Sequence, residues 1–250
     1  MPSSFRRSGL LDPLHALRLL ERGLLGCGLP DARRAVDEAL VLAGDAAWCM
    51  RCGVPLANAP CMPVAMRVGQ GLRCAACEAR PRFDAFIRLG SYRAPLDGLV
   101  RRAKEHAWHA ALAQLGWRLG DEVHRRLQLT RDGVVVVPIP TSPWRRLRRG
   151  TDHANELALG VAARLQLPHV RALHMGGFAR QAGLGRRERL LRAGRMVLRA
   201  RAAARMKGCG VLLVDDIRTT GATLDEARRL LEGAGAAWVA PSVACVAEIS

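Results

Sequence analysis

One segment near the end of the chain constrains its fold more than any other. The apolar run Val211–Val214 is followed at once by Asp215 and Asp216, then by a turn rich in threonine and glycine, and then by a helical pattern over residues 225–232. Ligands of open α/β sheets bind at the carboxyl ends of strands, and a strand that ends in two acids before a helix fits that edge. The segment therefore predicts an α/β fold and marks its binding edge.

The rest of the chain adds strands and helices in alternation. The four valines at 134–137 stand between Gly133 and Pro138, which predicts a buried parallel strand beside Val211–Val214. Such alternation predicts a mostly parallel sheet flanked by helices. The other predicted strands cover residues 85–92 and 238–246, and the predicted helices cover residues 10–25, 31–42, 97–113, 115–129 and 155–166.

The turn after the two acids has the composition of a phosphate-binding loop. Thr219, Thr220 and Thr223 supply hydroxyl donors, and Gly221 allows the backbone to approach a ligand closely. The helix that begins near Leu224 directs its N-terminal N–H groups at the same place, which suits a phosphate. The two carboxylates instead suit a sugar, whose vicinal hydroxyls donate hydrogen bonds to them. The plainer interpretation is an acid pair that caps a helix beside a threonine-rich turn.

Four of the eight cysteines form two knuckles. Cys49 and Cys52 are separated by two residues, as are Cys74 and Cys77, and residues 53–73 stand between the pairs. This spacing predicts a tetrahedral four-thiolate site for a structural Zn²⁺, which leaves no open position for catalysis. The alternatives are cysteines buried in an apolar core and a redox knuckle. Cys61 is an extra thiol within the loop, and its role is left open.

Residues 211–223 resemble the phosphoribosyl diphosphate signature of type I phosphoribosyltransferases. From about Cys49 to Val246 the chain also resembles the ComF family of competence and gluconate-uptake proteins. The family's usual RGFNQ turn reads Arg149-Gly-Thr-Asp-His153 here, and its usual Arg-x-x-Asn reads Arg189-Leu-Leu-Arg192. The matching features are the four-cysteine segment, the residues Tyr92, Pro95, Leu96, Arg102, Ala103 and Lys104, the run Val136–Pro140, the turn Arg148–Gly150, the segment Gln181–Arg189 and the final phosphate motif.

The resemblance implies a type I phosphoribosyltransferase domain over residues 81–250, behind a helical segment at 1–47 and a zinc-ribbon-like module at 48–80. It implies that Asp215 and Asp216 hold the ribose hydroxyls and stabilise positive charge at the ribosyl centre, while Mg²⁺ bridges the diphosphate oxygens. The implied ribosyl-phosphate ligands are Arg218, Thr219, Thr220, Gly221, Ala222 and Thr223, and the implied diphosphate ligands are Lys104, Thr141, Ser142, Arg145, Arg148 and Arg149.

The implied diphosphate ligands also have plainer interpretations. The proline-rich run at 138–140 marks a turn in any case, and Lys104 lies on a predicted helix whose surface would expose it. The arginines at 145–149 form a charge run, which is usually a solvated face. His106, His109 and His153 are interpreted as ordinary surface or packed residues and not as metal ligands.

The net charge indicates an anionic partner. The chain has 39 Lys and Arg residues against 22 Asp and Glu, a formal net charge of +17. Almost all of these cations are arginine, whose planar fork of donors matches phosphate oxygens in phosphorylated small molecules or single-stranded DNA. A GC-rich genome produces the same composition without any such partner. Aromatic residues make up 4% of the chain, which argues against extensive base stacking.

The sequence leaves the function open between classes. In the first, the chain is an enzyme that transfers ribose 5-phosphate from phosphoribosyl diphosphate to a nitrogen nucleophile that no segment identifies. In the second, it is a non-catalytic DNA-binding or processing accessory protein that works with DNA-uptake proteins. In the third, it is a regulator that binds the ribosyl ligand without turnover. No run of about 18 apolar residues exists and the first residues are too polar for a signal peptide, so we expect a cytoplasmic protein.

Overall fold

The computed structural model describes the chain in several ranges, namely residues 31–43, 47–56, 74, 77, 83–127, 129, 132–141, 151–176 and 196–247. Residues Ala32–Ser250 form one compact unit, which contains all the helices and strands named below, and Met1–Asp31 form another. Within the described ranges, no helix is both long enough and apolar enough to cross a membrane.

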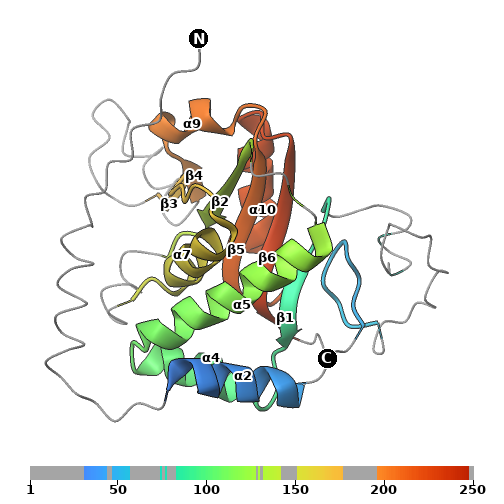
Figure 1. Ribbon diagram of the computed structural model, residues 1–250. Coiled ribbons are helices and arrows are strands. Elements are labelled where there is room, and N and C mark those ends of the chain that lie inside the picture. Colours follow the sequence, from blue (N-terminus) through green and yellow to red (C-terminus); the bar gives the residue numbers. More distant parts are fainter. Residues whose placement is uncertain are drawn as a thin grey trace, which may run out of the picture. The chain divides into compact units, whose positions relative to one another are not determined.

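A parallel four-stranded sheet forms the centre of the unit Ala32–Ser250 (Figure 1). Every pairing in it is parallel, and Gly210 pairs with Val134 on one side and with Trp238 on the other. The valine run therefore lies beside the strand that carries the acids, as the sequence predicts. The strands lie in the order β1 (Ile87–Ser91), β6 (Trp238–Val246), β5 (Gly210–Arg218) and β2 (Val134–Pro138).

Helices cover both faces of this sheet, with α5 and α7 across one face and α10 behind the other (Figure 1). Successive strand residues point to opposite faces, so Val136 packs with the core of α5 and α7 while Val137 packs with the core of α10. The predicted α/β fold, with a parallel sheet flanked by helices, is confirmed. The helices on the first side are α2 (Ala32–Ala43), α4 (Leu96–Glu105), α5 (His109–Leu127) and α7 (His153–Leu165), and those on the second side are α9 (Ala200–Met206) and α10 (Ala222–Gly233).

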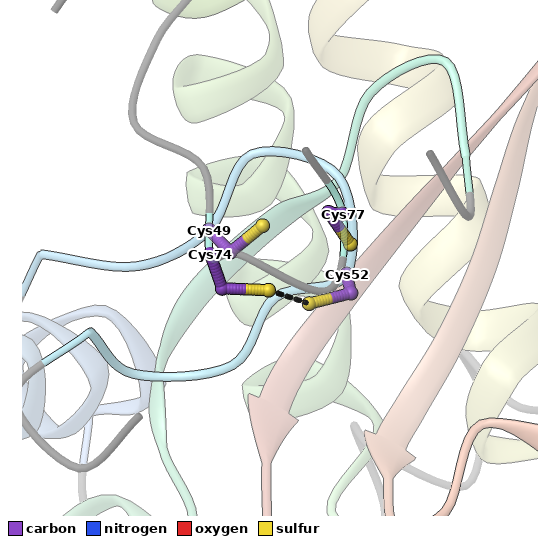
Figure 2. Close-up of side chains that lie close together, drawn as sticks. All are labelled: Cys49, Cys52, Cys74 and Cys77. Carbon is purple, nitrogen blue, oxygen red and sulfur yellow. Dashed lines mark hydrogen bonds between the residues drawn. The ribbon is translucent and has the colours of Figure 1, made fainter. Parts of the chain in front are cut away.

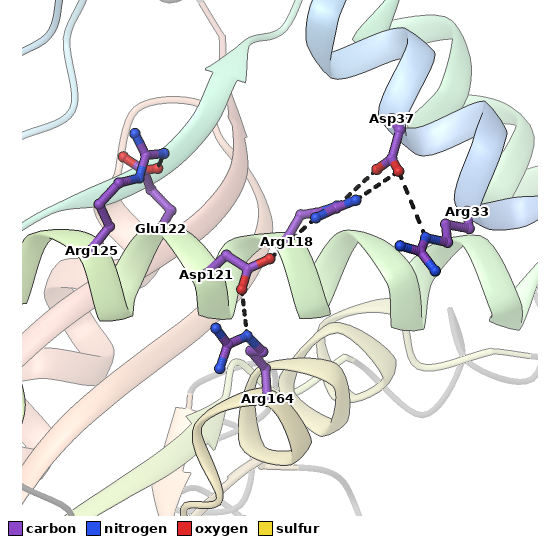
Figure 3. A network of polar contacts seen from close by, with 7 residues as sticks. All are labelled: Arg33, Asp37, Arg118, Asp121, Glu122, Arg125 and Arg164. Atoms are coloured by element: carbon purple, nitrogen blue, oxygen red, sulfur yellow. Dashed lines mark hydrogen bonds and ion pairs between the residues drawn. The ribbon is translucent and has the colours of Figure 1, made fainter.

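A chain of ion pairs ties α2, α5 and α7 together (Figure 3). Arg118 of α5 donates to both carboxylate oxygens of Asp37 on α2, at 2.7 and 2.6 Å. Arg33 adds a contact of 3.9 Å to Asp37, and Asp121 of α5 accepts a hydrogen bond from Arg164 of α7. Each pair is partly exposed and contributes at most about 1 kcal/mol. Close packing holds α7 on α5, because a Cβ added at Gly116 or Gly160 would overlap the backbone of the other helix.

The structure differs from the sequence prediction at several boundaries. The break between α4 and α5 lies at residues 106–108 and not near residue 114. Strand β5 continues past Val214 through both aspartates to Arg218, because β6 pairs with it over that length. The predicted helix at 10–25 lies outside the described residues. The short elements α9, β3 (Leu173–Met175) and β4 (Met196–Leu198) were not predicted, since so few residues carry little periodicity.

Candidate functional site

The two aspartates lie in the last part of β5, at the carboxyl edge of the sheet. Their backbone is fixed, because β5 is paired with β6 as far as Arg218. The alternation of the strand places Asp216 on the same face as Leu212 and Val214, which pack in the core shared with α4, α5 and α7. Asp215 belongs to the opposite face, which α10 covers. The two neighbouring acids therefore have different surroundings.

Two basic side chains from two helices approach one oxygen of Asp216. Lys104 of α4 places its Nζ 2.6 Å from Oδ2 of Asp216, and His153 of α7 places its Nδ1 3.7 Å from the same oxygen. The other oxygen, Oδ1, accepts a hydrogen bond of 2.6 Å from the backbone N–H of Ile217. The side chains of Lys104 and Asp216 are only 18% and 19% exposed, so this ion pair is largely shielded from water.

The surroundings shift the pKa values of the two carboxyl groups in opposite directions. Burial raises the pKa of Asp215 well above its ordinary value, and the charge of Asp216 raises it further. Burial acts in the same direction on Asp216, but His153 and Lys104 together outweigh it and hold the pKa of Asp216 below its ordinary value. Of the two acids, Asp216 therefore holds a negative charge more readily, whereas Asp215 resists ionisation.

The turn after β5 presents the beginning of α10 to solvent. Gly221 has a φ of 83°, in the left-handed region that glycine adopts without strain, and it allows α10 to begin at Ala222, two residues earlier than predicted. The hydroxyl of Thr220 accepts a hydrogen bond of 3.3 Å from the N–H of Ala222. Thr219, Thr220 and Thr223 are exposed. The first N–H groups of a helix lack partners within it, so this turn is able to hold an anion.

Part of the predicted diphosphate loop lies within the described residues. Thr141 follows β2 and donates a hydrogen bond of 3.1 Å to Asp152, which also accepts one of 3.2 Å from Arg171. These contacts fix the residue just before α7. Arg218, predicted to bind the ribosyl phosphate, is buried at the end of β5. The four other predicted ligands, Ser142, Arg145, Arg148 and Arg149, lie outside the described residues.

The four knuckle cysteines come together as the sequence predicts (Figure 2). All four are buried, and their sulfurs lie within 4.8 Å of one another. The Sγ atoms of Cys52 and Cys74 are 3.8 Å apart, too far for a disulfide bond. Zn–S bonds of about 2.3 Å in a tetrahedron imply S···S distances of about 3.8 Å. The four cysteines therefore fit a metal ion such as zinc.

Backbone hydrogen bonds shape the first knuckle. The carbonyl oxygen of Cys49 accepts from the N–H groups of Cys52, at 3.4 Å, and Gly53, at 2.8 Å, and Gly53 has the positive φ of 76° that closes the turn. The hydrogen bond between the thiols of Cys49 and Cys52 lowers the pKa of Cys49 to about 4 and raises that of Cys52. A thiolate at Cys49 is the form that binds a metal.

The knuckle is attached to the sheet just before β1. Arg51 donates hydrogen bonds to the carbonyl oxygens of Phe83, at 3.0 Å, and Asp84, and Trp48 donates one of 3.5 Å to the carbonyl of Phe86. A Cβ atom added at Gly53 would overlap the ring of Phe86. The module and β1 are therefore in close contact through Phe86.

Two cavities in the described part of the chain lie away from the acid pair. One of about 440 Å³ lies among α2, β1 and α5, with Trp48 and Arg88 in its wall. The other, of about 460 Å³, lies at the amino ends of three strands and is lined by Gly133, Gly210 and Trp238. Open α/β sheets bind ligands at the carboxyl ends of their strands, so neither cavity is the predicted ribosyl-phosphate site.

Sequence reasoning missed the position of His153. It was interpreted as an ordinary surface or packed histidine, and the structure places it, only 3% exposed, beside Asp216. The signal was present, because His153 stands at the last position of the turn that departs from the usual RGFNQ of the ComF family. Nothing in the sequence indicated that this turn and the end of β5 lie side by side.

No family model matches the chain. The chain is similar to Competence protein F of Haemophilus influenzae, with 28% identity over 168 residues, which are 65% of this chain and 73% of that protein. This relative confirms the resemblance to the ComF family that the motifs indicated.

The chain is also similar to solved structures of two enzymes, over part of the length of each. The glutamine phosphoribosylpyrophosphate amidotransferase from B. subtilis has 23% identity and a TM-score of 0.35, over 54% of this chain and 26% of its own. The phosphoribosylpyrophosphate synthetase from Mycobacterium smegmatis has 22% identity and a TM-score of 0.30, over 56% of this chain and 34% of its own. The chain thus spans about a quarter to a third of the length of these enzymes. The activities in their names are those of the two enzymes.

Proposed function

Because the chain is similar to Competence protein F and its strand β5 carries an acid pair shortly before a threonine–glycine turn, we propose that it binds phosphoribosyl diphosphate through Val211–Thr223. In this proposal it transfers ribose 5-phosphate to a nitrogen nucleophile. The main observation behind the proposal is the arrangement at the carboxyl edge of the sheet. There Asp216 lies in a strand whose backbone is fixed by β6, and α10 begins a few residues later.

The 5-phosphate would bind in the turn between β5 and α10. The exposed hydroxyls of Thr219, Thr220 and Thr223 supply donors, and the positive end of the α10 dipole favours the negative charge. Gly221 has no side chain to obstruct the approach of the phosphate oxygens, and its left-handed backbone would strain any residue with a Cβ. The proposal also includes Arg218 and Ala222 as ligands of the ribosyl phosphate. Ala222 would contribute because it is the first residue of α10.

The ribose hydroxyls would bind to the acid pair. Asp216 is ionised and accepts hydrogen bonds, whereas Asp215 keeps its proton more readily and is able to donate one. The negative charge on Asp216 would also stabilise the positive charge that develops on the ribosyl carbon as the diphosphate leaves. Lys104 now neutralises that charge, so a sugar hydroxyl must compete with Lys104 for Asp216.

The diphosphate would lie between α4 and the loop after β2. Lys104 is released from Asp216 when the sugar binds, and its ammonium group then has the diphosphate as an alternative partner. Thr141 lies at the carboxyl end of β2, on the same edge of the sheet. Mg²⁺ prefers oxygen ligands such as those of a diphosphate, and a bound ion would neutralise the leaving group.

Isothermal titration with phosphoribosyl diphosphate and Mg²⁺ tests the binding proposal directly. Ribose 5-phosphate and free diphosphate serve as controls that each carry half of the ligand. We expect phosphoribosyl diphosphate to bind more tightly than either control, because it engages the turn, the acid pair and the diphosphate ligands together. A titration without heat, together with no thermal protection by this ligand, excludes the proposal. Release of diphosphate when candidate nitrogen bases are added distinguishes an enzyme from a regulator.

The net charge of +17 and the name of the relative favour a second candidate, a DNA-binding accessory protein of DNA uptake. In this proposal Arg145 and Arg148 contact the backbone of single-stranded DNA, so affinity falls steeply with salt and depends little on sequence. A gel-shift assay with the double variant Arg145→Ala/Arg148→Ala tests it, and both affinity and salt dependence should fall. If the wild-type protein retains no single-stranded DNA at micromolar concentration and near-physiological salt, this candidate is excluded.

A further inference from the structure

His153 lies beside Asp216, although the two residues are far apart in the sequence. It is the first residue of α7, its side chain is 3% exposed, and its Nδ1 lies 3.7 Å from Oδ2 of Asp216. Close packing at Gly116 and Gly160 holds this helix on α5, and Arg164 adds a hydrogen bond to Asp121. Because Asp216 is on the face of β5 that packs toward α7, the fold itself brings the imidazole and the carboxylate together.

The acids next to His153 along the chain have other partners. Asp152, which precedes it, accepts hydrogen bonds from Thr141 and Arg171. Glu156, one helical turn later, is 3.7 Å from Nδ1 of His109. Of these three carboxylates, only that of Asp216 has an ion-pair contact with the imidazole among the described residues. The contact between His153 and Asp216 is therefore specific.

The surroundings of the ring decide which nitrogen carries the proton in the neutral form. Nε2 of His153 is buried and has no hydrogen-bond partner among the described residues. A proton on Nε2 would be a buried donor without an acceptor, which costs free energy, whereas a proton on Nδ1 faces a carboxylate. The favoured neutral form therefore donates from Nδ1 toward Asp216.

We propose that His153 is a positioning residue for Asp216. Lys104 and His153 approach the same oxygen of that carboxylate from α4 and α7. When the ligand draws Lys104 away, His153 keeps Asp216 ionised and oriented toward the sugar. His153 thereby makes the site favour a ribosyl diphosphate over a plain diphosphate, and this inference rests on the proposed binding of phosphoribosyl diphosphate.

Variants that keep one ring nitrogen at a time test the proposal. The amide nitrogen of asparagine reaches the position of Nδ1, whereas that of glutamine reaches the position of Nε2. We expect His153→Ala and His153→Gln to reduce the preference for phosphoribosyl diphosphate over free diphosphate about tenfold, because a contact of 3.7 Å is weaker than a full charge-assisted hydrogen bond. His153→Asn should retain most of it. The matched control is His109→Asn, which should leave the preference unchanged because His109 faces Glu156.

A second measurement needs no ligand. Nitrogen-15 NMR of the imidazole should show the Nδ1–H form for His153 in the neutral wild-type ring, and Asp216→Asn should change that signal while the His109 signal stays constant. An unchanged His153 signal in Asp216→Asn overturns the proposal, as does an equal ligand preference in the wild-type protein and His153→Ala. If wild type fails to bind phosphoribosyl diphosphate, the proposed function fails, and the spectra still decide on the pair. If His153→Ala does not fold, the Asn and Gln variants and the spectra decide.

Discussion

The four-cysteine module and the acid-pair edge hold their functional side chains in place by different means. The cysteines at 49–77 are supported, in the described residues, by turn hydrogen bonds, one isolated bridge between Trp48 and Pro55, and side-chain hydrogen bonds from Trp48 and Arg51 to the residues before β1. The aspartates instead belong to β5, which pairs with β2 as far as Val214 and with β6 as far as Arg218 within a parallel sheet. We therefore expect the first site to depend on a bound metal for its geometry, whereas the sheet itself fixes the backbone of the second.

The largest effect is expected from removal of one cysteine. Cys74→Ser takes away one of the four sulfurs, and a structural zinc site contributes on the order of 10 kcal/mol to the folding of its module. Metal analysis should therefore change from about one zinc per chain, as expected for one closed four-thiolate site, to almost none. Hydrogen exchange should show loss of protection at 47–56 with protection retained in β5 and β6.

Cys209→Ser is the control for this experiment, because Cys209 lies outside the cluster and is partly exposed. It should keep its zinc and its protection. Folded wild-type protein that was never exposed to chelator and still contains no metal contradicts the comparison. Unfolding of the sheet together with the module would show that the two regions are not independent.

A smaller loss of stability is expected at the contact between the two regions. Gly53→Ala introduces a Cβ that overlaps the ring of Phe86 on a backbone with positive φ. The backbone contributes about 1–2 kcal/mol and the overlap about 1–3 kcal/mol, so the free energy of unfolding should fall by about 3 kcal/mol. Gly133→Ala is matched, because Gly133 has a φ of 73° and open space around it. Urea unfolding should show only the backbone cost for Gly133→Ala, and equal losses in the two variants contradict the expected packing.

The next effect concerns ligand binding at the acid pair. Asp216→Asn removes the carboxylate that we propose accepts hydrogen bonds from the sugar hydroxyls, and it frees Lys104 from its ion pair. Affinity for phosphoribosyl diphosphate should fall about tenfold to hundredfold, the effect of a hydrogen bond to a charged group. Affinity for free diphosphate should stay the same or rise, since a negative charge has left the site. Calorimetry with both ligands measures the ratio of the two affinities. If both affinities fall equally, Asp216 supports the fold of the site and does not bind the sugar.

The smallest effect is a change in the pH dependence of stability. The pKa of Asp215 is raised in the folded protein, so its contribution to stability is complete below the pKa of the unfolded chain and is lost as pH rises toward the folded value. Asp215→Asn imitates the protonated acid and cannot ionise. The difference in free energy of unfolding between this variant and the wild type should therefore shift in favour of the variant from pH 5 to pH 8. Urea titrations at the two pH values measure it, and a constant difference contradicts the raised pKa.

The sequence by itself determined the features that depend on short stretches of chain. The valine run beside β5, the acid pair at a carboxyl edge, the turn at Gly221 and the two knuckles are all read from local pattern. Each of these features is set by a few consecutive residues. Side chains of a strand alternate between two faces with a period of two residues, and a cysteine knuckle forms its turn within four residues. For the same reason the resemblance to the ComF family could be recognised from motifs before the fold was known.

Only the tertiary structure decided how the two aspartates differ. Lys104 and His153 are far from Asp216 in the sequence, and they meet it because α4 and α7 pack on the face of the sheet to which that side chain points. Asp215, its neighbour in the chain, points to the other face and resists ionisation. Adjacent residues of a strand point into opposite layers, so their protonation states depend on helices whose packing no local pattern records.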